Sequence, residues 1–512
     1  MKIIDTSTLD PEGKDLNPSE VYWVYNALDC CLTSELRDVL KAKLDETRGA
    51  TYAEALRMQA PVLEMMLRGV LVDTSHRARV VKDFEQKLEH LNAAFQRICI
   101  EGLGLEGGVN WNSPLQVKSL MYVSLGMPVI KKRNSNGAME PSVDRESLEQ
   151  LSAHYHAELF CNFILAMRDL GKAIGFLKTP LDRDNRIRCN FNLAGTNTGR
   201  MSSSFNDFGT GTNLQNVDRD LRYIFVPDPG KVFVNIDLEQ ADSRNVGALC
   251  WEMFYESHGE KFAGAYLDAC ESGDLHTTVC RMAWQGLPWG DDPKGWKPLA
   301  NQIAYRNLSY RDLAKKLGHG TNYYGKPPTM AKHSKVPVKQ IIEFQSNYFA
   351  AFPCIPEWHK ETIRRLQADS SLTHLFGRQR HFFGRLDDQN VINAAIAYCP
   401  QGMTGEEINQ GLFALWLDRR FELFIQVHDS ILFQVDQREV NTLVPLALEL
   451  LKVTLMLKGG REFSVPLEAE VGWNWGKSNA ANPFGLSKWK GEESRTPPRR
   501  IINNRSVLQE LL

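Results

Sequence analysis

The chain has 512 residues and a formal net charge of −2, with 43% hydrophobic and 24% charged residues. This length exceeds one small domain and suits several lobes around one or two hydrophobic cores. The composition is that of a globular protein, and the near-neutral charge excludes an argument for nucleic-acid binding from bulk charge, so such a partner has to be inferred from local basic stripes.

Membrane insertion and export are both disfavoured by the sequence. No uninterrupted apolar stretch reaches the ~20 residues that a membrane-spanning helix needs. The N-terminal stretch MKIIDTSTLDPEGKD is polar and acidic, unlike a signal peptide. The ten cysteines contain no C-x-x-C pair, which argues against a zinc ribbon or a disulfide framework and suits a reducing compartment. We therefore expect a soluble, intracellular protein.

Helices and one short strand are predicted for the first hundred residues. An amphipathic helix is expected over 20–46. Residues 58–73 predict a helix that stops at Gly69 and is followed by a short strand. Three side chains can then cap the next helix, namely Asp73, Thr74 or Ser75. That helix repeats its apolar residues with a period of 3.6, at Val80, Val81, Phe84, Leu88, Leu91, Phe95 and Ile98.

Further along the chain, helices give way to a strand-rich stretch. A helix is expected to begin at Ser113 with Pro114 in its first position, and a longer one over 144–177 with a break near His156. The segments between and before them are predicted to be loops rich in Gly and Asn, at 103–112 and 132–142. Residues 186–235 are polar and rich in Gly, Ser, Thr and Asn, which predicts short strands and loops.

The remaining elements are a buried strand, a helical region and a hairpin. The strand is predicted over 231–237, helical sequence then runs to about residue 416, and 422–435 predicts a strand–turn–strand hairpin. The segment from 477 to 512 is polar and basic, so we expect a flexible or surface-wrapped tail.

Asp237 ends the predicted strand and precedes a polar run that contains Gln240 and Asp242. A carboxylate that emerges where a buried strand ends is held rigidly at a cleft. The alternative is an aspartate that caps the following helix, and that alternative is favoured when Asp237 is considered alone.

His428 and Asp429 occupy the turn of the predicted hairpin. Aspartate is common in turns, so a structural role is again favoured for Asp429 alone. Two aspartates at the tips of neighbouring strands, however, can share two metal ions about 3.5–4 Å apart that stabilise the attacking and leaving oxygens of a displacement at phosphorus. Mg²⁺ suits such a site because it binds through one or two carboxylates plus substrate phosphates.

Four side chains recur at intervals of four residues, Arg311, Lys315, His319 and Tyr323, and share one helix face. The row spans about 18 Å, which is comparable with a nucleoside triphosphate laid lengthwise. Two cations at one end would meet phosphates, and two rings at the other would meet sugar and base. The alternative, a solvated basic face that ends in a core tyrosine, explains the cations but not the ordered passage from cation to ring.

A polar stretch before the predicted strand carries Thr198-Gly199-Arg200 and Asn213-Leu214-Gln215-Asn216. Arginine and amide side chains can reach minor-groove acceptors, which are similar for all base pairs, so they would test pairing geometry rather than sequence. An ordinary loop rich in Asn and Ser is the alternative, with even odds when this segment is considered alone.

Taken in order, these motifs resemble DNA polymerase family A over about 58–476. IDLEQADSR at 236–244 is similar to the first palm motif, which implies that Asp237 is a metal ligand and the Leu238 carbonyl a second contact, with Gln240 and Asp242 beside the incoming dNTP. QVHDS at 426–430 is similar to the second palm motif, which implies Asp429 as the other metal ligand and His428 near the primer terminus.

The other motifs resemble the nucleotide-binding and DNA-binding parts of the same family. RDLAKKLGHGTNYYG at 311–325 resembles the fingers helix that binds dNTP through Arg311, Lys315, His319 and Tyr323, and GDLH at 273–276 resembles the segment whose histidine, here His276, meets a dNTP phosphate. The implied primer–template contacts are Arg200, Asn213, Gln215, His428 and Gln401 of PQG at 400–402. VPLEAEVGWNWG at 465–476 resembles the family's closing strand.

The resemblance implies an α+β, right-hand polymerase fold with an antiparallel-sheet palm, helical fingers and a helical thumb. The expected divisions are an exonuclease-like remnant or N-terminal helix (1–57), a thumb with the segment leading into it (58–177), palm (178–240), fingers (241–400), palm again (401–476) and a basic tail (477–512).

Three residues depart from the family pattern. Asp242 stands where the family has a glutamate that blocks the ribose 2′-OH, and because aspartate is one methylene shorter we expect weaker exclusion of ribonucleotides. His319 replaces the usual Phe or Tyr, so sugar discrimination at that position does not carry over. Ser430 replaces a glutamate, which leaves two metal carboxylates rather than three.

Tyr25-Asn-Ala-Leu-Asp29 resembles the last motif of the 3′–5′ exonuclease that precedes this polymerase in the family. The segment upstream of the thumb leaves no room for an exonuclease fold, and one aspartate does not hold two metals. The hypothesis is that the exonuclease was lost or resides on a separate chain. The alternative is a helix that simply packs at the junction of thumb and palm.

The implied reaction is attack by a primer 3′-OH on the α-phosphorus of a dNTP, with two Mg²⁺ ions (Mn²⁺ able to substitute) and release of pyrophosphate. The implied partners are primer–template DNA, dNTPs and, beyond them, an exonuclease subunit or processivity factor, with no membrane. The missing exonuclease and the variant motifs favour a phage-like source. Two alternatives remain. The first is a single-subunit RNA polymerase, which is disfavoured by Asp242 and by the TGRMSS and NLQN segments. The second is a non-catalytic nucleic-acid-binding protein with a polymerase fold, which is disfavoured by the intact Asp237, Asp429, Arg311 and Lys315.

Overall fold

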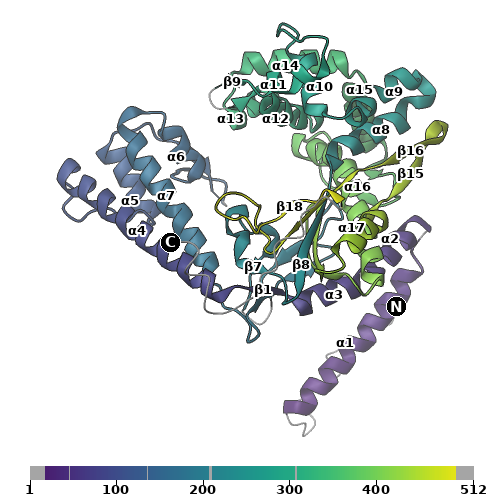
Figure 1. The fold of residues 1–512 in the computed structure, drawn as a ribbon, viewed down its shortest axis with the longest axis horizontal. Helices are drawn as coiled ribbons and strands as arrows, with labels where there is room; N and C mark the ends of the chain where they lie inside the picture. The colour runs from purple at the N-terminus through teal and green to yellow at the C-terminus, as the bar shows by residue number, and fades with distance from the viewer. Residues whose placement is uncertain (1–17, 45, 135, 207–209, 306–307, 492–512) are drawn as a thin grey trace.

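The computed structural model describes residues 18–44, 46–134, 136–206, 210–305 and 308–491. They form a small antiparallel sheet with a helical arm on one side and a larger helical group above it (Figure 1). No helix within these ranges is long and apolar enough to cross a membrane.

The central sheet has five strands in the order β13-β14-β8-β17-β18, all antiparallel. Its bounds are β8 (Lys231–Leu238), β13 (Glu422–Val427), β14 (Ser430–Asp436), β17 (Leu467–Gly472) and β18 (Ser487–Lys488). Successive residues Val232, Phe233 and Val234 are all fully buried, so both faces of the middle strand are covered. This burial fixes the register, because a slip by one residue would exchange the two faces.

The helical arm has a hydrophobic core of its own, built around Phe95, Val117, Leu148 and Ile164. Its elements are α4 (Thr74–Arg97), α5 (Pro114–Lys118), β2 (Lys131–Arg133), β3 (Met139–Pro141), α6 (Arg145–Leu151) and α7 (Tyr155–Leu177), with π-helical turns at Ile98–Gly102 and Ser119–Ser124. The arm packs mainly through α4 against α7.

The helical group above the sheet shares one continuous core with it. Trp358, Tyr266, Tyr348 and Tyr398 are the largest fully buried side chains of this group. Its elements are α8 (Ala241–His258), α9 (Glu260–Glu271), α10 (Leu275–Ala283), α11 (Pro293–Ala300), β9 (Ile303–Tyr305), β10 (Leu308–Ser309), α12 (Tyr310–Asn322), α13 (Pro327–Ser334), α14 (Val338–Ala351), α15 (Cys354–Asp369), β11 (Ser371–Thr373), β12 (Gln379–His381) and α16 (Gln389–Leu417).

The remaining elements belong neither to the central sheet, nor to the arm, nor to the helical group. They are α1 (Pro18–Lys41), α2 (Glu46–Arg57), α3 (Gln59–Arg68), β1 (Val70–Val72), β4 (Arg186–Ile187), β5 (Asn190–Asn192), β6 (Ser202–Ser204), β7 (Phe225–Val226), α17 (Val440–Leu451), β15 (Thr454–Leu457) and β16 (Arg461–Ser464), with 3-10 turns at Leu214–Asn216, Arg219–Ile224 and Lys458–Gly460. Met58, Val62, Met65 and Val72 pack with the sheet's core rather than with the arm's core.

Several predicted elements are confirmed. Asp73 caps α4 by accepting a 2.8 Å hydrogen bond from the backbone N–H of His76, and Gly69 ends α3. The helix expected over 144–177 breaks between Leu151 and Tyr155, as α6 and α7. The buried strand and the hairpin are present as β8, β13 and β14.

Two local expectations are wrong. The helix expected over 20–46 ends at Lys41. The expected loop at 132–142 contains the hairpin β2–β3, whose strands are exposed and therefore lack the alternation that marks a half-buried strand. In the described part of the tail, Ser487–Lys488 pairs with β17 as the edge strand β18, which agrees with the surface-wrapped alternative. The remainder of the tail, 492–512, lies outside the described residues.

Helix α1 extends away from the rest of the molecule (Figure 1). Asp29 lies on it and is exposed. Its large side chains Tyr22, Trp23 and Tyr25 are 74%, 69% and 64% exposed. The alternative in which this helix packs at a junction between two lobes is therefore not what the structure shows.

Candidate active site

Asp237 and Asp429 are neighbours at one end of the central sheet. Asp237 lies near the end of β8 opposite Ser430, the first residue of β14. The backbone N–H of Leu238 donates a 3.0 Å hydrogen bond to the carbonyl oxygen of Asp429. Asp237 is not a helix cap, because α8 begins only at Ala241. The two aspartates singled out from distant parts of the sequence thus meet at adjacent strand tips.

The two carboxylates also act on each other electrostatically. Desolvation by the surrounding protein, and then the negative charge of Asp429, raise the pKa of Asp237 to about 7. Glu470 and Glu468 add to this rise, and Lys477 opposes it. Desolvation likewise raises the pKa of Asp429. Asp237 nevertheless remains accessible to solvent, so a cation from solution can reach it.

Helix α12 and the residue that follows it carry the basic row, which consists of Arg311, Lys315, His319 and Tyr323. Ser309 caps it, and Ser309 and Asp312 form a reciprocal capping box. Its buried face consists of Leu313, Ala314, Leu317 and Gly318, which leaves Lys315 and His319 exposed on the other face. Tyr323 is the first residue after the helix, and its ring centroid lies 4.7 Å from that of His319. Arg311, Lys315 and His319 therefore lie four residues apart on α12 itself, and Tyr323, the fourth member of the row, is the C-cap residue of the helix.

Asp242 connects the row to the strand tips. The protein around the Tyr323 hydroxyl raises its pKa, and the Asp242 carboxylate raises it further. The same carboxylate contributes to the raised pKa of Asp429, after desolvation. Asp242 is thus close both to Tyr323, at the ring end of the row, and to Asp429, so the ring end of the row lies near the strand tips.

His276 lies beside the cationic end of the row. Desolvation, Arg311 and Lys315 together lower the pKa of His276 to about 4. The ring is therefore neutral at physiological pH and offers a hydrogen bond rather than a charge.

Asp274 is a site residue that the sequence analysis missed. It caps α10, and its carboxylate accepts two hydrogen bonds from Arg311, at 3.1 Å from Nε and 3.1 Å from Nη2. This bidentate pair fixes the guanidinium in one plane. The GDLH segment contained the signal, since an aspartate before a helix is a typical cap, but sequence alone did not indicate its cation partner.

The residues predicted to contact primer and template are held in different ways. Arg200 donates from Nη2 to Asp242 Oδ1 at 2.9 Å. Asn213 Nδ2 donates to the Ser203 carbonyl at 2.6 Å, and Gln215 Nε2 to the Gln426 carbonyl at 2.8 Å. These two amides brace loops beside β13.

Three further predicted residues lie near the same region. His428 is exposed in a left-handed conformation at the hairpin turn, with φ 55°. Gln401 lies close enough to the Tyr323 hydroxyl to affect its pKa. Gln240 precedes α8 with φ 57°, and its side-chain Oε1 is buried without a hydrogen-bond partner.

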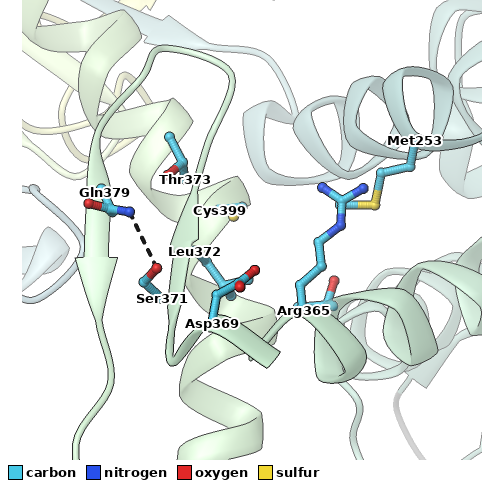
Figure 2. Close-up of a pocket in the computed structure, with 9 residues that line it drawn as sticks. Met253, Arg365, Asp369, Ser371, Leu372, Thr373, Gln379 and Cys399 are labelled. Carbon is cyan, nitrogen blue, oxygen red and sulfur yellow. Dashed lines mark hydrogen bonds between the residues drawn. The ribbon is translucent and has the colours of Figure 1, made fainter. Parts of the chain in front are cut away.

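A separate concavity of about 450 Å³ lies between α8, α15, the β11–β12 hairpin and α16 (Figure 2). Arg365, Asp369 and Gln379 supply polar groups to its lining. None of the predicted site residues lines it. It is therefore distinct from the aspartate pair and the basic row.

Comparison with known proteins gives a consistent result. The model of DNA polymerase family A matches residues 75–286 and 297–477. The thermostable DNA polymerase I of Thermus thermophilus is 25% identical over 497 residues, which is 92% of this chain and 53% of that protein. DNA polymerase I of Caldicellulosiruptor bescii is 24% identical over 83% of this chain and 47% of its own length. The chain thus spans about half the length of these relatives.

A solved structure shares the fold. The POL domain of Pol1 from M. smegmatis, in complex with DNA primer–template and dNTP, superposes with a TM-score of 0.65. The match covers 82% of this chain and 70% of that one, at 22% identity. The expected right-hand fold is therefore confirmed.

Proposed function

The chain belongs to DNA polymerase family A, and from this premise we propose that it is a template-directed DNA polymerase that adds dNTPs to a primer 3′-OH with release of pyrophosphate. The observation that carries the proposal is the meeting of Asp237 and Asp429 at adjacent strand tips, with the Tyr323 end of the basic row close by through Asp242. The central sheet would serve as the palm, the helical group over 241–400 as the fingers, and the arm as the thumb.

The donor set at the strand tips fits divalent metal ions. Two close carboxylates whose pKa values are raised by desolvation gain most from a bound cation. Asp237, Asp429 and the Leu238 carbonyl would hold two Mg²⁺ ions, or Mn²⁺ in their place, and the triphosphate and water would complete the coordination. Within the described ranges no group of three or more His, Cys, Asp or Glu is arranged to hold a metal. When bound, the metals lower the pKa of the 3′-OH and neutralise charge on the triphosphate.

The chain's own residues would orient the nucleotide. Arg311 and Lys315 would bind the triphosphate and stabilise charge that develops on it, with Arg311 held in place by Asp274. His276 would donate a hydrogen bond to a phosphate oxygen from its neutral ring. The rings of His319 and Tyr323 would lie along the sugar and base, and the buried Oε1 of Gln240, which has no partner, would face the nucleotide together with Asp242.

The DNA would lie across the sheet between thumb and fingers. Arg200, Asn213, Gln215, Gln401 and His428 would contact the primer terminus and template near the paired end. Arg200 would have to exchange its present partner, Asp242, for a minor-groove acceptor. Most other contacts would be to phosphates, so binding should weaken with salt.

We also propose that synthesis proceeds without proofreading by this chain, with an exonuclease or a processivity factor supplied by a separate partner. Asp29 lies exposed on the projecting helix α1. Upstream of it, Asp10 and Glu12 form an Asp-x-Glu pair that lies outside the described residues. Trimming of mismatched primers is therefore the direct test of proofreading by this chain.

Primer extension with the purified 512-residue chain tests the function. With Mg²⁺ and a primed template, we expect each dNTP to be added only opposite its complement, with much slower addition of NTPs and no shortening of a mismatched primer when dNTPs are left out. Asp237→Asn is expected to lose extension while binding the primer–template as tightly as the wild type. Efficient extension by Asp237→Asn, or preference for NTPs, would contradict the proposal.

A further inference from the structure

A buried polar group lies directly behind Asp242. Its members are Asn245 on α8 and Thr404 and Glu407 on α16, and they are 0%, 0% and 4% exposed. Asn245 Nδ2 donates to Thr404 Oγ1 at 3.1 Å and to Glu407 Oε2 at 3.3 Å. Buried polar side chains are expensive unless they are paired, so a function of their own is expected of them.

Thr404 connects this buried polar group to Asp242. Its hydroxyl lies 3.0 Å from Asp242 Oδ1 and 3.0 Å from the carbonyl oxygen of Pro400. Since Asn245 already donates to the hydroxyl oxygen, the single hydroxyl proton is left to donate, and the carboxylate is the stronger acceptor. Arg200 donates to the same Oδ1 at 2.9 Å. Two donors from different elements therefore fix one oxygen of Asp242.

Glu407 keeps this arrangement free of a second charge. Desolvation raises its pKa to about 8, the Asn245 hydrogen bond opposes the rise, and the charge of Asp242 adds to it. A neutral Glu407 carries a proton, and the buried Oδ1 of Asn245 is an acceptor without a partner. Glu407 therefore adds no negative charge beside Asp242 at neutral pH.

We propose that Thr404 is the positioning residue for Asp242, and that the Asn245–Thr404–Glu407 group sets how strictly the polymerase excludes ribonucleotides. The inference rests on the proposed function, in which Asp242 lies beside the sugar of the incoming nucleotide. An aspartate is short, so its effect on the sugar depends on where its carboxylate is held. With Oδ1 held by Thr404, the Asp242 carboxylate is fixed in orientation even when Arg200 turns to the DNA, whereas a released carboxylate can rotate and accept a ribose 2′-OH.

The test compares sugar selectivity in Thr404→Val, which keeps the shape of the side chain and removes the hydroxyl. The measured quantity is the ratio of kcat/KM for a dNTP to that for the matching NTP. We expect the ratio to fall by about 3- to 10-fold, the size of one ordinary hydrogen bond, mostly through more efficient use of the NTP. The kcat/KM for the dNTP should change much less, and Thr404→Ser, which keeps the hydroxyl, should restore the ratio.

Thr362→Val is the matched control. Thr362 on α15 is 2% exposed and its hydroxyl has no hydrogen-bond partner, so this variant removes a buried hydroxyl that touches no site residue. It should keep the wild-type ratio. A wild-type ratio in a folded Thr404→Val, or an equal fall in Thr362→Val, would overturn the inference. If Thr404→Val does not fold, Thr404→Ala removes the same hydroxyl and is judged by the same ratio.

The experiment distinguishes a failure of this inference from a failure of the proposed function. If the wild type does not extend a primer with dNTPs, the proposed function fails and the inference falls with it. If the wild type extends and Thr404→Val discriminates as the wild type does, only the inference fails.

Discussion

At the scale of single residues, Asp237 lies at the proposed metal site, where its negative charge is electrostatically unfavourable. Desolvation, Asp429 and two nearby glutamates hold its pKa at about 7, well above the ordinary value near 4. The folded chain therefore binds this proton more tightly than the unfolded chain does. It follows that the contribution of Asp237 to the free energy of unfolding falls as the pH rises from about 4 to about 7, and stays lower above that.

Asp237→Asn should therefore stabilise the metal-free chain at alkaline pH. We expect its free energy of unfolding at pH 8, with a chelator present, to exceed that of the wild type by about 1 kcal/mol once solvent screening of the accessible carboxylate is allowed for. The gain should vanish below about pH 3, where the wild-type carboxyl is protonated in both the folded and the unfolded state. Denaturant unfolding at several pH values measures it.

Asp436→Asn provides a control of opposite sign on the same sheet. Asp436 ends β14, and Arg438 lowers its pKa to about 2. Its replacement should not stabilise the chain at pH 8. A gain for Asp436→Asn as large as that for Asp237→Asn, or no gain for Asp237→Asn, would show that the strand tips are not an acidic cluster.

Sequence reasoning found the residues whose chemistry is carried by a motif, but not those whose role depends on a tertiary partner. Asp237, Asp429 and the α12 row were singled out by spacing and by resemblance. Asp274 and Thr404 were not found by sequence reasoning. The role of Asp274 depends on Arg311, and the role of Thr404 depends on Asp242, and in each pair the two residues lie on different elements. Such partners are set by packing rather than by local pattern.

At the scale of elements, the start of α10 is coupled to the start of α12. Asp274 caps α10 by accepting hydrogen bonds from Thr277, and the same carboxylate clamps Arg311 at the beginning of the basic row. One side chain thus orients the helix that bears His276 and the cation that would meet the triphosphate.

Asp274→Asn should weaken nucleotide binding without unfolding α10. Asparagine caps helices about as well as aspartate, but it cannot hold a guanidinium by two charge-assisted hydrogen bonds. We expect the KM for dNTP to rise by about 3- to 10-fold with little change in thermal stability. Steady-state single-nucleotide addition measures this.

The matched control is Asp292→Asn. Asp292 caps α11 by accepting a 3.0 Å hydrogen bond from the backbone N–H of Lys294, and no ion pair is found for its carboxylate within the described ranges. Its substitution should leave the KM unchanged. Equal KM values for the two variants would remove Asp274 from the nucleotide site.

Elements with a strong apolar period were predicted well, and short exposed strands were not. The hairpin expected at 422–435 is β13–β14, and α12 begins and ends close to the predicted row. The β2–β3 hairpin and the edge strand β18 carry polar side chains, so nothing in their sequence distinguishes them from loops. Their pairing depends on a neighbour that the sequence does not specify.

At the scale of the whole molecule, the site depends on a register between strands from distant parts of the chain. Apolar patterns predicted β8 and β14 as buried strands, but not that Ser430 faces Asp237. That Asp237 and Asp429 lie together was expected from the chemistry of two aspartates at strand tips and from the resemblance to a known family, not from a predicted register. Its physical basis is the burial of both faces of β8, which allows one register.

The account's central claim is that Asp237 and Asp429 act as one unit. Its most direct test is a double-substitution cycle on the single-turnover rate of dNTP addition with Mg²⁺, using Asp237→Asn, Asp429→Asn and the combined variant. We expect each single variant to lose at least about 10³-fold and the combined variant to be hardly slower than either, because residues that act as a unit have non-additive effects. Losses that multiply in the combined variant, or near-wild-type addition by either single variant, would contradict it.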